Sequence, residues 1–156
     1  YAVGGGNVLQ MVCDVTIAAD NAMFRQVGPM VGSFDAGYGT WYLEDLVGKK
    51  RAKEMWFSNP KISPQQAVDM GLINRVVPAA ELKAATRAWA LEIADRGSFA
   101  LASIKSAFNA RHGGVGGLSR MAHDLLLRGY LDTAEHDEMA ASFAERRKPD
   151  SSKFGH

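Results

Sequence analysis

The chain opens on an informative stretch, in which residues 3–12 read Val-Gly-Gly-Gly-Asn-Val-Leu-Gln-Met-Val. A β-branched residue before three glycines, with an apolar run after them, predicts a strand end, a tight turn and a short buried helix. The amides of residues 4–6 would then lie at the positive end of that helix, where glycine lets a ligand approach the backbone closely. Such a turn suits a phosphate or an enolate oxyanion, although a turn that only packs the helix on its strand explains the triplet more simply.

A second glycine-rich stretch, residues 26–40, has Asp35 as its only charged residue. A carboxylate among glycines and apolar side chains is expected to be partly desolvated, which raises its pKa and prepares it for proton transfer. Ser33 is a nearby hydrogen-bond partner. The alternative is that Asp35 caps the N-terminus of a helix over residues 37–47.

Composition places the chain among ordinary globular proteins. Its 156 residues suit one domain of normal size, and 47% of them are hydrophobic and 22% charged. A net charge of +1, from 18 basic and 17 acidic residues, indicates neither nucleic acid nor an anionic membrane as a partner. The absence of a long uncharged apolar run predicts no membrane span.

Cys13 is the only cysteine, which excludes a disulfide framework within the chain and a cysteine zinc site. Its apolar surroundings predict a small core residue, and a reducing cytoplasm suits this cysteine usage. The 4 histidines show no metal-ligand spacing, so no metal is expected. Because the chain begins with Tyr1 and an apolar segment that runs straight into a turn, we expect a further N-terminal segment in the whole protein.

The rest of the chain combines short strands with helices and then becomes helical. Extended segments are expected near residues 15–18, 23–24 and 73–77, and helices over 41–47 and around 52–56. A capping box at Ser63-Pro-Gln-Gln66 predicts a helix start, and Gly71 its end. Helical spacing continues over 82–93 and 101–108, and a glycine break at 113–117 precedes two helices over 118–128 and 133–146. The sequence therefore predicts the α/β class.

Several motifs together resemble one known family. They are Tyr1-Ala-Val-Gly-Gly-Gly-Asn-Val-Leu9, Cys13-Asp14, Ile17-Ala-Ala-Asp-Asn-Ala22, Phe24-Arg-Gln26, Gly28-Pro29, Val31-Gly-Ser-Phe-Asp-Ala-Gly-Tyr-Gly39, Val47-Gly-Lys-Lys50, Ala67-Val-Asp-Met-Gly-Leu-Ile-Asn74 and Arg147-Lys-Pro-Asp-Ser-Ser-Lys-Phe154. The chain resembles the crotonase (enoyl-CoA hydratase/isomerase) superfamily over essentially its whole length. Within the superfamily, the chain most resembles the 1,4-dihydroxy-2-naphthoyl-CoA synthases and the related 2-ketocyclohexanecarboxyl-CoA hydrolases. Members are longer at the N-terminus.

The resemblance implies a crotonase-type spiral of ββα turns. Residues 1–78 would form the later turns with the active-site loop, and residues 79–156 a helical oligomerisation region. The family implies a cytoplasmic homo-oligomer, either a trimer or a hexamer. Its substrate would be an acyl-CoA, so coenzyme A would bind as part of the substrate.

The resemblance also assigns roles around the glycine turn. Gly5 would supply one amide of the oxyanion hole that holds the thioester carbonyl as it becomes an enolate. Hydratases of this superfamily carry two catalytic glutamates, and the matching positions here are Val8 and Gly28. Because neither residue can exchange a proton with water, addition of water to an enoyl-CoA is not expected.

In the naphthoate branch, the residue that matches Gly28 leaves room for a bicarbonate ion that acts as base. Gln26 and Trp56 match residues that line that bicarbonate pocket. Asp35 and Ser33 match the acid and its hydrogen-bonding neighbour on the other side of the substrate.

Two positions depart from the branch. Val27 stands where many bicarbonate-using members have a threonine, which weakens the anion site. A family tyrosine that contacts the substrate falls on Leu131, with Tyr130 one residue away, so either the alignment slips by one residue or the substrate pocket differs.

The resemblance leaves three functions open. The first is a lyase-type ring closure of o-succinylbenzoyl-CoA to 1,4-dihydroxy-2-naphthoyl-CoA in menaquinone synthesis. The second is hydrolytic opening of a cyclic 2-ketoacyl-CoA. The third is a non-catalytic crotonase-like subunit that serves assembly only.

Overall fold

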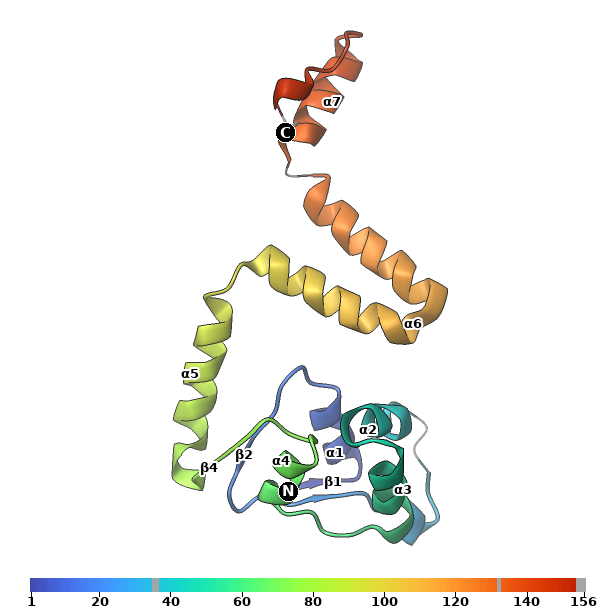
Figure 1. The fold of residues 1–156 in the computed structure, drawn as a ribbon, viewed down its shortest axis with the longest axis vertical. Helices are drawn as coiled ribbons and strands as arrows, with labels where there is room; N and C mark the ends of the chain where they lie inside the picture. Colours follow the sequence, from blue (N-terminus) through green and yellow to red (C-terminus); the bar gives the residue numbers. More distant parts are fainter. Residues whose placement is uncertain (35–36, 132, 154–156) are drawn as a thin grey trace. The chain divides into compact units, whose positions relative to one another are not determined.

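A computed structural model describes residues 1–34, 37–131 and 133–153. The chain forms two compact units, Tyr1–Leu91 and Glu92–His156, which we describe separately. The first contains the strands and most of the short helices, and the second is helical (Figure 1). The functional division expected at residues 78–79 stays a prediction.

Short parallel strands form the β structure of the first unit. β1 (Ala2–Val3) pairs with β3 (Phe24–Arg25), and β2 (Ile17–Ala19) pairs with β4 (Arg75–Val77). A parallel pair needs a crossover connection, and β1 reaches β3 through α1 (Gly5–Met11) and β2. These strands lie within two residues of the extended segments predicted from the sequence, and the α/β class is confirmed.

Helices surround these strands, and local signals explain several of their ends. α2 (Gly39–Val47) ends where Gly48 adopts a positive φ of 79°, and α3 (Lys49–Ser58) follows directly. The predicted capping box of α4 (Pro64–Asp69) is present, because Gln66 N donates to Ser63 Oγ and Ser63 N donates to Gln66 Oε1. α5 (Leu82–Ala94) follows β4, and between them lies the 3₁₀ turn η2 (Ala79–Glu81).

The core of the first unit is built from side chains of both strand pairs and of α1 to α4. Its most deeply buried apolar members include Leu43, Met55 and Ala67, and Phe24 joins them from β3. Phe24 also exchanges two backbone hydrogen bonds with Ile62, which anchors the segment after α3 to this strand. This core therefore fixes the position of β3 against the end of α3.

The expectation that Cys13 is a core residue is wrong. Cys13 is exposed, and its Sγ donates to the Leu9 carbonyl at 3.3 Å. The apolar stretch around it lies at the surface after α1 ends, since Val12 and Val15 are each about 40% exposed. Apolar neighbours in sequence do not bury a residue when no other element packs over the turn.

The second unit contains two consecutive helices, which a kink joins within α6 (Ser98–Gly129). α6 bends at Gly114, which has a φ of 53° that only glycine adopts readily. A Cβ at Gly117 would lie 2.4 Å from the Ala110 carbonyl oxygen, so the bend needs glycine there too. Ser106 Oγ donates to Asp124 Oδ2 at 2.9 Å across the bend. The predicted glycine break at 113–117 between two helices is therefore confirmed, and the non-helical residue within it is Gly114.

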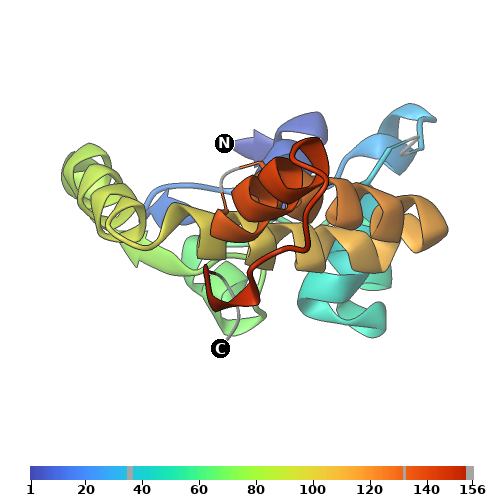
Figure 2. The same ribbon diagram turned by 90° about the horizontal axis from the view of Figure 1, so that it is seen from above.

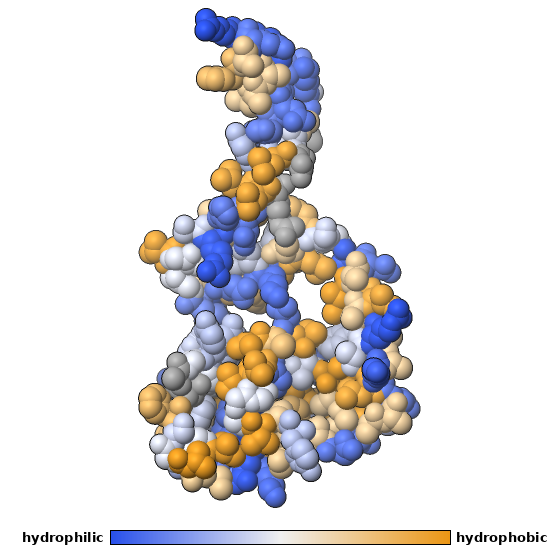
Figure 3. Space-filling view, turned by 180° about the vertical axis from the view of Figure 1, so that it is seen from behind, coloured by the Kyte–Doolittle hydropathy of each residue, from blue (hydrophilic) through white to orange (hydrophobic). Residues whose placement is uncertain are grey.

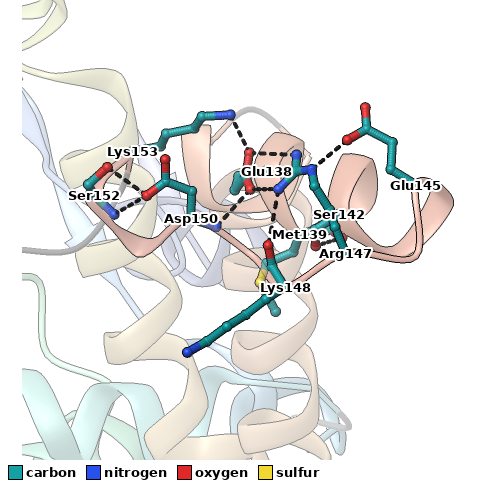
Figure 4. Close-up of polar contacts among 9 residues, drawn as sticks. All are labelled: Glu138, Met139, Ser142, Glu145, Arg147, Lys148, Asp150, Ser152 and Lys153. Carbon is teal, nitrogen blue, oxygen red and sulfur yellow. Dashed lines mark hydrogen bonds and ion pairs between the residues drawn. The ribbon is translucent and has the colours of Figure 1, made fainter.

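The C-terminal segment folds back onto α7 (Ala134–Ala144), and its last turn, η3 (Ser151–Lys153), lies beside that helix (Figure 2). Glu138 of α7 is 3% exposed. Its carboxylate accepts hydrogen bonds from the Arg147 guanidinium, the Asp150 amide at 2.8 Å and the Lys153 ammonium at 2.6 Å (Figure 4). One buried carboxylate therefore binds three residues of this segment.

Large apolar side chains remain exposed on both units (Figure 3). On the second unit, Phe108 is 74% and Phe143 87% exposed. Among the residues that the structure describes, none of the helices combines the length and hydrophobicity that crossing a membrane requires.

Candidate active site

The glycine turn has a conformation that only glycine adopts easily. Gly4 is the N-cap of α1, with φ 54° and ψ −120°, and its amide donates to the Arg25 carbonyl at 2.9 Å. Its carbonyl accepts from the amides of Asn7 and Val8. The strand end, tight turn and helix predicted from the triplet are therefore confirmed.

Gly5 is the first residue of α1, and the first amides of a helix have no acceptor within the helix. A Cβ added at Gly5 or Gly6 would meet no heavy atom within 4 Å. The backbone here is open to a ligand, as an oxyanion-hole amide requires. The role of Gly5 stays a prediction that this geometry allows.

Gln26 and Trp56 carry buried polar atoms that have no hydrogen-bond partner within the described parts of the chain. Gln26 follows β3 and is 1% exposed, and both Oε1 and Nε2 of its amide are unpartnered. Trp56 lies in the last turn of α3, and its indole Nε1 is likewise buried and unpartnered. Leaving such groups unsatisfied is costly, about 1–3 kcal/mol each. Native structures rarely carry that cost without a ligand or water.

Gly28 lies where it can pack closely against Trp56. It begins the 3₁₀ turn η1 (Gly28–Val31). A Cβ at this position would be 3.3 Å from Trp56 Cζ3 and 3.1 Å from the Ser33 carbonyl oxygen. The structure therefore brings Gly28 and Trp56, 28 positions apart in sequence, into contact, and only a residue without a side chain fits easily.

Ser33 lies next to Gly28 as well, because its amide donates to the Gly28 carbonyl at 2.9 Å. Its Oγ donates to the Phe34 carbonyl at 3.4 Å, a long bond. Asp35 lies outside the described residues. The N-cap of α2 is Tyr38, whose side chain makes no capping bond, so this helix does not begin on an acidic cap.

Tyr130 lies in the second unit, directly after α6. Its ring meets the His136 ring edge-on at a centroid distance of 4.2 Å, and half of its surface is exposed. Its predicted contact with substrate stays a prediction.

Sequence reasoning missed Arg25 and Asn59, which connect the two elements that carry Gln26 and Trp56. Asn59 follows α3 with a left-handed φ of 49°. Its backbone carbonyl accepts a hydrogen bond from Arg25 Nε at 2.7 Å. The sequence does contain a signal, since asparagine followed by proline is typical of a helix C-terminus.

Comparison with known proteins identifies the family to which this chain belongs. The sequence model of the enoyl-CoA hydratase/isomerase family matches residues 1–153. The chain therefore belongs to that family, the crotonase superfamily.

Solved structures agree with this assignment. The chain is 27% identical to Pseudomonas aeruginosa DspI, with a TM-score of 0.72 over 96% of this chain and 57% of that one. An enoyl-CoA hydratase from Bacillus anthracis is 28% identical, with a TM-score of 0.68 over 95% and 57%. Enoyl-CoA hydratase subunit I from Geobacillus kaustophilus HTA426 is 30% identical, with a TM-score of 0.70 over 96% and 58%. The fold is the crotonase fold, and this chain spans less than three fifths of the length of these relatives.

Proposed function

We propose that the protein closes a ring on an acyl-CoA, as a 1,4-dihydroxy-2-naphthoyl-CoA synthase that acts on o-succinylbenzoyl-CoA with bicarbonate as its base. The observation that supports this function best is that Gln26 and Trp56 carry buried, unpartnered polar atoms, close in the fold to Gly28, against which the Trp56 ring packs. The activity belongs to the whole protein, of which the relatives' lengths indicate that this chain is a part.

The residues present fit bicarbonate. Gln26 Nε2 and Trp56 Nε1 are N–H donors that would pair with anion oxygens, and Gln26 Oε1 would accept from the anion's hydroxyl. Donors that are already buried and oriented bind an anion without losing further side-chain freedom. When bound, bicarbonate would supply the basic oxygen that removes the α-proton of the thioester.

The remaining roles go to this chain's own groups. The Gly5 amide would hold the thioester oxygen as negative charge develops on it, and a preorganised donor of this kind is typically worth about 10²–10³ in rate. Asp35 would return a proton on the other side of the substrate, with Ser33 as its hydrogen-bonding neighbour. Tyr130 would contact the acyl group.

Hydration of an enoyl-CoA has less support, although two of the solved relatives are named as hydratases. The positions of both hydratase glutamates hold Val8 and Gly28, neither of which carries an acid. General acid–base groups contribute about 10²–10⁴ each. We therefore expect crotonyl-CoA hydration to be negligible beside ring closure.

The test measures turnover of o-succinylbenzoyl-CoA by the full-length protein in carbon dioxide-depleted buffer and with bicarbonate added back. We expect the rate to rise with bicarbonate and to saturate. Gly28→Asp would introduce a carboxylate beside Trp56, and Gly28→Ala is its control, because it adds the same crowded Cβ without the acid. Without bicarbonate, Gly28→Asp should be at least about 10²-fold faster than Gly28→Ala.

Two outcomes would overturn the proposal. If bicarbonate leaves the rate unchanged, the base lies elsewhere. If the protein hydrolyses 2-ketocyclohexanecarboxyl-CoA faster than it closes o-succinylbenzoyl-CoA, ring opening replaces ring closure as its function.

A further inference from the structure

We propose that Asn59 and Arg25 are positioning residues for the anion pocket, because together they tie the end of the helix that carries Trp56 to the strand that leads to Gln26. The inference rests on the proposed function, since it concerns the same pocket. It adds two residues that do not line the pocket themselves.

Asn59 controls the end of the helix that carries Trp56. Its side chain is 5% exposed, and its Nδ2 donates to the Trp56 carbonyl at 3.0 Å and to the Met55 carbonyl at 3.3 Å. The last carbonyls of a helix have no partner within it, and a helix end that lacks partners frays. Asn59 supplies these partners from a left-handed backbone conformation that asparagine tolerates. It thereby fixes the turn from which the indole projects.

Arg25 joins this helix end to the strand that leads to Gln26. Its Nε donates to the Asn59 carbonyl at 2.7 Å, and Arg25 immediately precedes Gln26. Two backbone bonds between Phe24 and Ile62, at 2.9 and 3.0 Å, run beside this contact. The Arg25 side chain thus links the segment that contains Gln26 to the end of the helix that contains Trp56.

The Arg25–Asn59 bond matters for anion binding, because no hydrogen bond among the described residues fixes the Gln26 amide or the Trp56 indole in place. Neither the Gln26 amide nor the Trp56 indole nitrogen has a partner among the described residues. Their spacing therefore depends on the elements that carry them. If the end of α3 loosens, the donors separate, and an anion must draw them together when it binds.

The experiment compares Asn59→Gly, Arg25→Met and Arg25→Lys in the full-length protein. Glycine keeps the left-handed backbone at position 59 and removes only the side-chain donor. Two readouts are taken: the bicarbonate concentration for half-maximal rate, and the bicarbonate dissociation constant from tryptophan fluorescence, with the same titration of Trp56→Phe giving the signal of all other tryptophans. Asn59→Gly loses two hydrogen bonds and Arg25→Met loses one. Either loss should raise the half-maximal bicarbonate concentration and the bicarbonate dissociation constant about 3- to 10-fold, with the KM for the acyl-CoA unchanged. Arg25→Lys, which keeps a donor, should lie nearer the wild type than Arg25→Met.

Asn74→Ala is the matched control. Asn74 also ties two segments of the first unit together, since its Oδ1 accepts from the Thr16 amide at 2.8 Å, but it takes no part in the pocket contacts described above. We expect this variant to lose stability with no change in either bicarbonate value.

The outcomes separate the inference from the proposed function. If the wild type responds to bicarbonate and the Asn59 and Arg25 variants respond identically, or if Asn74→Ala shifts bicarbonate binding as much as they do, the positioning role is wrong. If bicarbonate changes neither the fluorescence nor the rate of the wild type, the proposed function is wrong, and so is the positioning role.

Discussion

Val27 connects the glycine turn with the proposed anion pocket. A Cβ added at Gly4 would lie 3.2 Å from the Val27 Cγ2 methyl, so this side chain packs directly over the turn. Val27 also separates Gln26 from Gly28 in sequence. A methyl group here contributes packing but no hydrogen bond, whereas the isosteric threonine would add a hydroxyl.

We predict that Val27→Thr strengthens bicarbonate binding. A hydroxyl near a bound anion adds a charge-assisted hydrogen bond, so the bicarbonate concentration for half-maximal rate should fall, by about fivefold. Val68→Thr is the control, because Val68 packs against the core of the same unit and undergoes the same chemical change. An equal shift in both variants, or none in Val27→Thr, would contradict this role for position 27.

At the scale of elements, the C-terminal segment depends on one ion cluster. The Arg147 side chain, followed by that of Lys153 and the Asp150 amide, holds the pKa of Glu138 well below its ordinary range. A carboxylate whose pKa is lowered by folding stabilises the folded state above its unfolded pKa, and that contribution is lost as the pH falls toward the folded value. The cluster should therefore be strongest at neutral pH.

We predict that Glu138→Gln releases the segment 146–153 from α7. The neutral amide would lack the negative charge that Arg147 and Lys153 share, so the backbone amides of this segment should exchange with solvent faster at pH 7. The difference from the wild type should shrink below about pH 4, where an ordinary glutamate is protonated. Amide hydrogen exchange across a pH series from neutral to acidic measures this.

Glu145→Gln is the control for that experiment. Glu145 also bonds Arg147, at 2.5 Å, but its side chain is 60% exposed, and exposed ion pairs contribute little. Equal exchange in the two variants would show that Glu138 has no special part in holding the segment.

At the scale of the whole molecule, the exposed apolar side chains of the second unit suit self-association, which we propose as the role of this helical region. Phe99, Phe108 and Leu118 of α6 are each at least half exposed. Covering one such side chain at an interface contributes roughly 1.5–3 kcal/mol.

We predict that Phe108→Ser shifts the full-length protein toward smaller species at micromolar concentration, measured by sedimentation velocity. Asn109→Ser changes an exposed polar neighbour and should leave the distribution unchanged. A wild type that sediments as a monomer would rule out self-association.

Much of the fold could be read from short stretches of sequence. Three local features were predictable: the turn at the glycine triplet, the end of the helix before Gly48, and the capping box at Ser63–Gln66. Each depends on backbone sterics and hydrogen bonds within a few residues. The family followed from motifs spread along the chain, and the family comparison confirms it. The finer activity, the bicarbonate site and the role of Asp35 stay proposals.

Other features depended on packing between distant segments. The exposure of Cys13 could not be read from its neighbours, because burial is decided by what packs over a residue and not by what adjoins it in sequence. Motif matching pointed to Gln26, Gly28 and Trp56, but only the folded chain shows that Gln26 and Trp56 are buried without partners and that Gly28 touches the Trp56 ring. A hydrogen-bonding group is satisfied or unsatisfied according to the elements that reach it in space, and here those elements lie about 30 residues apart in the chain.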